Sequence, residues 1–192
     1  MEIFKELPVL LFDDQSTWHN WLEENHKQTH GIWLKLAKKS SGKSSISYED
    51  ALEEAICYGW IDGQKQTYNN EYWLQKFSSR GSKSVWSKVN VAKAEMLIKS
   101  GKMQTSGLKT VNSAKKDGRW KAAYDSARTS TIPEDFQFAL NSNPKAKQFF
   151  DTLNRANVYA FCWRVQTAKK PETRQARIEK FIEMLSKGEK LH

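Results

Sequence analysis

Cysteine and histidine are scarce in this sequence. Its 192 residues include only two cysteines, Cys57 and Cys162, which lie 105 positions apart, and four histidines. With so few thiols the chain cannot be a disulfide-rich scaffold or hold a cysteine-based zinc cluster, and it fits a reducing compartment. No H-E-x-x-H motif occurs either. We therefore expect no metal site and no cofactor.

Long apolar runs are missing as well. A membrane-spanning helix needs about 20 consecutive apolar residues, and the apolar run near the start, Leu7–Phe12, has only six and contains Pro8. The residues before it include Glu2 and Glu6, whereas a secretory signal begins with basic residues. We expect a cytoplasmic protein without a transmembrane segment.

The common catalytic fingerprints are also absent. The chain has no G-x-S-x-G elbow, no P-loop and no G-x-G-x-x-G motif. Both cysteines fall on apolar helical faces, and a thiol needs nearby positive charge and access to react. We assign no catalytic residue and favour a protein that is not an enzyme.

Aromatic residues and positive charge, by contrast, are plentiful. Aromatics make up 12% of the chain and include eight Trp, which excludes a disordered protein. The net charge is +9, but it is −3 over residues 1–80 and +12 over residues 81–192. This asymmetry indicates an anionic partner for the second part, or merely solvated helix faces. Because no nucleic-acid motif is present, we expect at most weak, non-specific nucleic-acid binding.

Hydrophobic periodicity predicts an α+β fold. A helix is expected over 16–26, a strand over 32–37 and a second helix capped by Ser47. Two aromatic strands, 60–66 and 72–77, are separated by turn-forming residues and should form a hairpin. These elements predict a small antiparallel sheet accompanied by N-terminal helices.

Residues 84–188 have a helical pattern, with helices opened by Pro or closed by Gly. The first of these helices is expected to bury four apolar residues on one face: Val85, Val89, Ala92 and Met96. We expect 1–192 to be a single compact domain, in which the α+β portion over 1–80 holds the sheet. The helical portion over 84–188 is expected to pack on that sheet.

Asp62 is the most informative carboxylate. It follows Trp60 at strand spacing, so both side chains should project to the same side of the sheet, and Gly63 leaves room beside it in a bulge. Asp62 could bond backbone groups, contact a ligand or act as a general acid or base. The predicted ligand-binding group consists of Trp60, Asp62, Gln64, Trp73, Trp86 and Asn90.

A second group of candidate residues is cationic and lies near the end of the chain. Arg174 and Arg177 are three residues apart and should be neighbours on the last helix. The group is either an anion-binding site or a solvated face, and it comprises Arg164, Lys169, Arg174 and Arg177.

Several runs of the sequence are distinctive: Tyr48–Gly63, Tyr72–Phe77, Trp86–Lys88 with Asn90, and Ala168–Arg174 with Arg177–Lys180. These runs resemble the YdeI/OmpD-associated family, also described as OmdA or bacteriocin-protection proteins. The resemblance covers roughly 14–192. It implies a bacterial protein involved in tolerance of antimicrobial peptides and associated with an outer-membrane porin, and it brings no established reaction or cofactor.

Together these features favour a non-catalytic stress-protection protein. It would bind a small molecule or peptide at an aromatic pocket near Trp60 and Asp62. Two alternatives remain open at this point. The basic second half could bind nucleic acid non-specifically, or Asp62 could serve a small enzyme as general acid or base.

Overall fold

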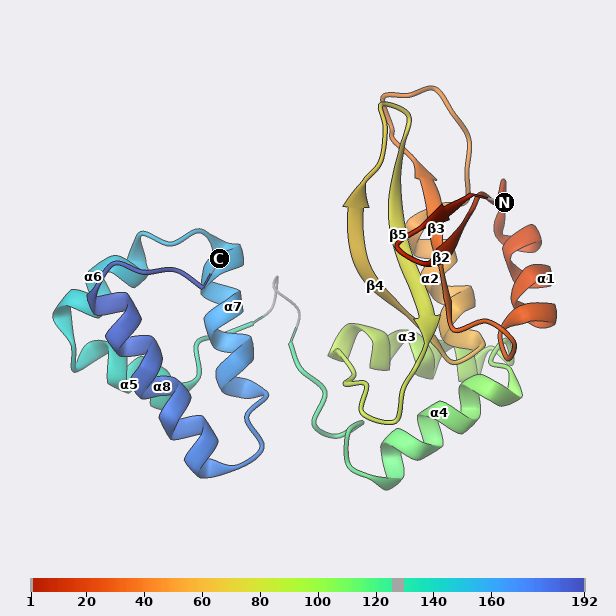
Figure 1. Ribbon diagram of the computed structural model, residues 1–192. Coiled ribbons are helices and arrows are strands. Elements are labelled where there is room, and N and C mark those ends of the chain that lie inside the picture. Colours follow the sequence, from red (N-terminus) through yellow and green to blue (C-terminus); the bar gives the residue numbers. More distant parts are fainter. Residues whose placement is uncertain (1, 126–129, 192) are drawn as a thin grey trace. The chain divides into compact units, whose positions relative to one another are not determined.

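The computed structural model describes residues 2–125 and 130–191, which form two compact units (Figure 1). The first unit comprises Met1–Trp86 and Asn90–Ala122, and the second comprises Ser87–Val89 and Ala123–His192. The boundary between the two units therefore lies near residue 122. The sequence had placed the boundary between its two expected portions at residues 80–84. A single domain over 1–192 stays a prediction.

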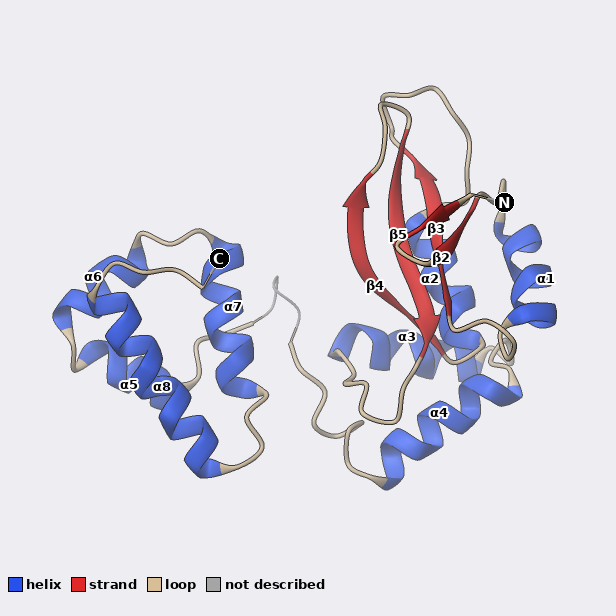
Figure 2. Cartoon of the chain, viewed as in Figure 1, coloured by secondary structure: helices blue, strands red, loops and turns tan. Residues whose placement is uncertain are grey.

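A five-stranded sheet organises the first unit (Figure 2). Its strands lie in the order β1-β2-β3-β5-β4, and every pair is antiparallel except β2 with β3. The strands are β1 (Ile3–Phe4), β2 (Leu7–Leu10), β3 (Gly31–Ala37), β4 (Trp60–Thr67) and β5 (Tyr72–Ser79). The α+β class and the β4–β5 hairpin are confirmed, including the bulge, which lies between Asp62 and Lys65. The strands β1 and β2 were not predicted.

Helices accompany this sheet in the first unit. They are α1 (Gln15–Asn25), α2 (Tyr48–Cys57), α3 (Lys88–Lys99), which joins the unit from Asn90, and α4 (Thr105–Lys116). The Ser47 hydroxyl accepts a hydrogen bond from the Asp50 amide at 3.1 Å, which confirms the predicted cap of α2. The Asp14 carboxylate caps α1 in the same way, at the Thr17 amide.

Trp18 of α1 joins the helices to the sheet. Its ring lies 6.3 Å from that of Trp60 and 5.9 Å from that of Phe77, and its indole N–H donates to the Ala51 carbonyl at 3.1 Å. On the opposite face of the sheet, Trp33 packs edge-on against Phe4. The strand β3 is thus buried on both faces, and truncating such a buried Trp to Ala costs about 3–5 kcal/mol.

The end of α2 and the start of α4 approach each other closely. The Gln104 amide donates to the Cys57 carbonyl at 3.1 Å. A Cβ on Gly107 would lie only 2.2 Å from that same carbonyl oxygen, so only glycine fits there. Gly59 ends the α2 region at a φ of +78°, as its position after the helix predicts.

The second unit is helical in its described residues. Its helices are α5 (Glu134–Asn141), α6 (Pro144–Asp151), α7 (Arg155–Gln166) and α8 (Pro171–Ser186). Its core includes four phenylalanines with ring centroids 5.1–6.5 Å apart: Phe136, Phe150, Phe161 and Phe181. Pro144 and Pro171 both stand in the first turn of their helices, as predicted.

The predicted buried face of α3 is wrong. Val85 lies before the helix begins and is 40% exposed, and Met96 is 70% exposed. The residues that α3 buries are Asn90, Ala94 and Leu97. The predicted face was counted from Val85, which lies outside the helix, so it fell one residue away from the face that α3 actually buries.

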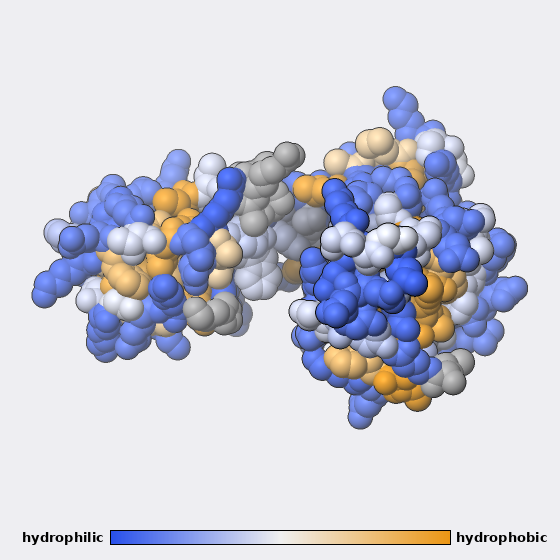
Figure 3. Space-filling view, turned by 90° about the horizontal axis from the view of Figure 1, so that it is seen from above, coloured by the Kyte–Doolittle hydropathy of each residue, from blue (hydrophilic) through white to orange (hydrophobic). Residues whose placement is uncertain are grey.

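Hydrophilic side chains cover most of the face shown in Figure 3, with apolar atoms reaching the surface between them. Across residues 2–125 and 130–191, no helix combines the length and apolar character needed to cross a bilayer.

Candidate functional site

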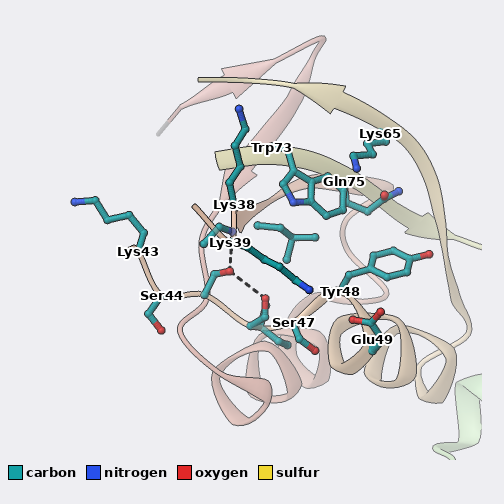
Figure 4. Close-up of a pocket in the computed structure, with 14 residues that line it drawn as sticks. Lys38, Lys39, Lys43, Ser44, Ser47, Tyr48, Glu49, Lys65, Trp73 and Gln75 are labelled. Atoms are coloured by element: carbon teal, nitrogen blue, oxygen red, sulfur yellow. Dashed lines mark hydrogen bonds between the residues drawn. The ribbon is translucent and has the colours of Figure 1, made fainter. Parts of the chain in front are cut away.

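A pocket of about 850 Å³ opens in the first unit between the sheet and the N-terminus of α2 (Figure 4). Its walls come from the end of β3, the loop 38–47, the first turn of α2, and strands β4 and β5. The size is typical of small-molecule sites in proteins.

Trp73 is the aromatic surface of this pocket, and Tyr48 faces it. The two ring centroids are 6.2 Å apart with planes tilted by 41°. The Lys65 ammonium lies 4.1 Å from the centre of the Trp73 ring, so the indole already holds one cation by its π face. A ligand beside Trp73 would therefore meet the Lys65 ammonium over the face of the ring.

Four of the lining residues are lysines: Lys38, Lys39, Lys43 and Lys65. Glu49 is the sole carboxylate among the residues that line the pocket. In Figure 4 the Lys39 side chain extends toward Tyr48, whereas Lys38 and Lys43 point outward. Lys43 forms an exposed ion pair with Glu71 at 3.3 Å, which contributes little in water. The pocket has a positive balance and favours an anionic ligand.

Asp62 reaches this site through Tyr48. The Tyr48 hydroxyl donates to the Asp62 carboxylate at 2.9 Å, and both side chains are partly buried. This bond joins β4 to α2. It also holds the Tyr48 ring, which lines the pocket although Asp62 does not.

Gln75 shapes the wall next to the bulge. It is 4% exposed, and its amide nitrogen donates to the carbonyls of Gly63 at 2.9 Å and Gln64 at 3.3 Å. These bonds satisfy the carbonyls that the bulge removes from the strand ladder. Gln64 contributes its backbone in this way, while its own side chain is exposed.

The structure does not bring the six predicted ligand-binding residues together. Trp60 pairs with Ser79 and Trp73 pairs with Thr67, so the two indoles stand six or seven residues apart along the hairpin, roughly 20 Å. Trp60 is 1% exposed, and its indole N–H donates to the His26 carbonyl at 3.1 Å.

The other two predicted ligand residues also lie outside the Trp73 pocket. Trp86 lines a separate, smaller pocket, where the Arg80 guanidinium covers its ring at 3.6 Å. Asn90 is buried in the first turns of α3. The strand spacing of Trp60 and Asp62 did give their direction correctly, since both contact the helices on one side of the sheet, through Trp18 and Tyr48.

The predicted anion-binding arginines are largely engaged within the second unit. Arg174 makes a two-point ion pair with Asp135 at 2.5 and 2.8 Å, and also donates to the Val165 carbonyl. Arg177 donates to the carbonyl of Arg164, and these two residues line a pocket of about 460 Å³. Lys169 lies exposed between α7 and α8.

A polar cluster around Glu54 escaped the sequence reasoning. Glu54 is 8% exposed and accepts hydrogen bonds from the Gln15 amide at 2.7 Å and from His19 at 2.9 Å. The other ring nitrogen of His19 lies 3.2 Å from the Tyr58 hydroxyl. Burial, and secondarily the carboxylates of Glu23 and Glu54, raise the pKa of Tyr58 to about 12, so this hydroxyl stays protonated. The helical spacing of Glu54 on a largely apolar face was the one available signal.

Both cysteines are buried and unpaired. Burial raises the pKa of Cys57 to about 12 and that of Cys162 to about 11, which suppresses the reactive thiolate. Among the described residues, no three His, Cys, Asp or Glu side chains gather as metal ligands would.

Family models match two successive parts of the chain. A model for a domain of unknown function, DUF8412, matches residues 10–110, which is more than half of the sequence. The chain belongs to this family. A second model, described as bacteriocin-protection, YdeI or OmpD-associated, matches residues 129–188 and identifies an OmdA domain there. No curated protein and no solved structure matches the chain.

These matches confirm the family resemblance and locate it more narrowly. The OmdA match covers 129–188 rather than 14–192, and the Gly59–Gly63 run lies in the DUF8412 part. The Trp73 pocket also lies within the DUF8412 part. The OmdA description therefore applies to α5–α8, and the pocket lies in the first unit.

Proposed function

We propose that the protein acts by binding rather than by catalysis, as a cytoplasmic protection protein of the OmdA type. Its DUF8412 part would hold a small molecule, or the end of a peptide, that combines a planar ring with an anionic group. The observation that carries this proposal is the aromatic surface of Trp73, bordered by Tyr48 and four lysines.

The chemistry of the pocket supports this ligand class. An aromatic ring can stack on Trp73 once the Lys65 ammonium moves from the ring face to the anionic group of the ligand. The stack is worth about 0.5–1.5 kcal/mol beyond the area it buries. A carboxylate, sulfonate or phosphate on that ring would replace water around Lys39 and Lys65 with charge-assisted hydrogen bonds. Asp62 supports the site by holding Tyr48, which is a positioning role rather than that of an acid or base.

A dye-binding experiment tests the proposal. Anilinonaphthalene sulfonate carries the required ring and anion, and its fluorescence reports binding. We expect saturable binding that weakens by about fivefold or more in Lys39→Gln and in Trp73→Leu. Lys27→Gln is the matched control, because it removes one exposed lysine charge away from the pocket. Equal affinities in all four proteins would refute the pocket as the binding site.

A survival assay connects binding with protection. Bacteria expressing the Trp73→Leu protein should survive bacteriocin challenge less well than those expressing an equal folded amount of the unchanged protein. Lys27→Gln should protect fully. Full protection by Trp73→Leu, despite lost dye binding, would separate the pocket from the protective role and overturn the proposal.

A further inference from the structure

A second, smaller pocket of about 180 Å³ lies in the first unit, where the segment after β5 meets α4. Three of its lining residues are cationic: Arg80, Lys109 and Arg119. Three hydroxyl residues, Ser82, Thr110 and Ser113, also line it, and none of its lining residues is acidic. The Thr110 hydroxyl donates to the Gly107 carbonyl at 2.8 Å, whereas the Ser113 hydroxyl accepts from Arg119 at 3.3 Å and keeps its own proton. Ser82 and Ser113 are therefore the hydroxyl donors that an anion would meet. Its volume is below the roughly 300–1,000 Å³ of ordinary small-molecule sites, which suits a single ionic group.

Two of the cations are held in place by the protein. Arg119 donates to both oxygens of Asp117 and to the Ser84 carbonyl at 2.9 Å, and its side chain is 10% exposed. Arg80 lies flat over Trp86, with its guanidinium carbon 3.6 Å from the ring centre, and donates to the Val85 carbonyl at 3.2 Å. Stacked or bonded guanidinium groups keep their orientation, so less entropy is lost when an anion arrives.

Lys109 supplies the third cation. It is exposed on α4 and forms no ion pair with any other residue in the described part of the chain. Asp117 offsets the charge of Arg119, but Lys109 has no such counter-charge. An oxyanion entering this pocket would gain both a cation and hydroxyl donors.

We propose that this pocket binds one phosphate-type oxyanion, either inorganic phosphate or the phosphate group of a small phosphomonoester. A tetrahedral oxyanion offers acceptors in several directions at once, which matches cations and hydroxyls that come from the 80–86 segment, from α4 and from Arg119 just after α4. The site is distinct from the Trp73 pocket and does not rest on the function proposed for that pocket.

Calorimetric titration of the full chain tests this site at constant ionic strength. The titrants are two phosphate probes, inorganic phosphate and methyl phosphate, and a single-stranded DNA oligonucleotide. We expect saturable binding of a phosphate probe that weakens by about fivefold or more in Lys109→Gln. Lys116→Gln is the matched control, because it removes an exposed lysine from the last turn of the same helix. If only methyl phosphate binds, the ligand of the site is a phosphomonoester. If both phosphate probes bind, free phosphate is a ligand as well.

Three results would overturn the proposal. One is the absence of saturable binding by either phosphate probe. Another is an equal loss in both lysine variants, which would show a diffuse charge effect. The third is binding of DNA alone with loss in Lys109→Gln, which would assign the surface to a polyanion. Trp73→Leu should leave phosphate binding unchanged, and this keeps the two sites experimentally separate.

Discussion

Gly107 provides the sharpest test of how the first unit is assembled. Replacing it with Ala adds one methyl group to α4, where that carbon would stand 2.2 Å from the Cys57 carbonyl oxygen and 2.5 Å from the Met103 sulfur. Ordinary contacts of this kind begin near 3.4 Å. Met103 is a flexible side chain and can move, but the Cys57 carbonyl is backbone at the end of α2. The helix α4 must therefore shift by about 1 Å or distort.

Two effects of opposite sign set the magnitude. Alanine favours a helix over glycine by up to about 1 kcal/mol, and this gain would raise stability if space were available. Overpacking of a filled interior typically costs about 1–3 kcal/mol and sometimes more. Because backbone cannot yield as a side chain does, we expect the steric cost to exceed the gain, with a net loss of about 1–2 kcal/mol. For a chain of this size that lowers the melting temperature by roughly 2–8 °C.

Thermal unfolding followed by circular dichroism measures the change, with Gly81→Ala as the control. A Cβ at Gly81 would meet no atom closer than the Ser84 hydroxyl at 3.8 Å, so that variant should melt at or slightly above the normal temperature. A Gly107→Ala protein that melts at the same or a higher temperature would refute the close packing of α4 on α2. Because α4 carries Lys109 and Ser113, the shift should also weaken phosphate binding.

Other substitutions and conditions test single contacts. Asp62→Ala removes the acceptor of the Tyr48 hydroxyl and should lower the free energy of unfolding by about 1.5–3 kcal/mol, as expected for a charge-assisted hydrogen bond. In a double-mutant cycle of chemical unfolding, adding Tyr48→Phe should cost little more. The Arg174 guanidinium holds the pKa of Asp135 below its usual 3.8, so the stability from this pair is present at neutral pH and is lost as the pH falls below about 3.8. The melting temperatures of the unchanged protein and of Asp135→Asn should therefore converge at low pH, and a constant difference would contradict the pairing. Cys57, with its pKa raised to about 12, should not react with a thiol reagent at neutral pH until the protein unfolds, and rapid labelling of the folded chain would show that it is accessible.

Local signals made part of this fold predictable. The Ser47 cap depends only on residues within one helical turn, and the β4–β5 hairpin depends on two aromatic runs around a short turn. The strand β2 gave no such signal, because Pro8 interrupts its apolar run. That proline is tolerated near the start of a short strand that pairs with the sheet through Val9 and Leu10.

The set of residues that line the candidate site depends on contacts between segments far apart in sequence, which sequence patterns do not show. Three successive tryptophans, Trp60, Trp73 and Trp86, were predicted to line one pocket. The hairpin instead places Trp60 and Trp73 at opposite ends of its length. Three of the lysines that border Trp73 lie in the loop 38–47 and the fourth is Lys65 of β4, and none of them was predicted as a site residue. Spacing along a strand fixes the direction of a side chain, whereas tertiary folding decides which loop comes to lie beside it.

The division into two units also changes the meaning of the positive charge. Counted from residue 81, the chain has an excess of +12, which pointed to a basic C-terminal half. Counted by unit, the first carries 18 basic and 14 acidic residues, and the second carries 13 basic and 8 acidic residues, giving +4 and +5. Much of the charge that had appeared to belong to the second half lies on α3 and α4, which belong to the first unit from Asn90 onward. Net charge thus singles out neither unit as a surface for a long polyanion. Lysines and arginines of the first unit gather instead at the two pockets for which we propose small anionic ligands.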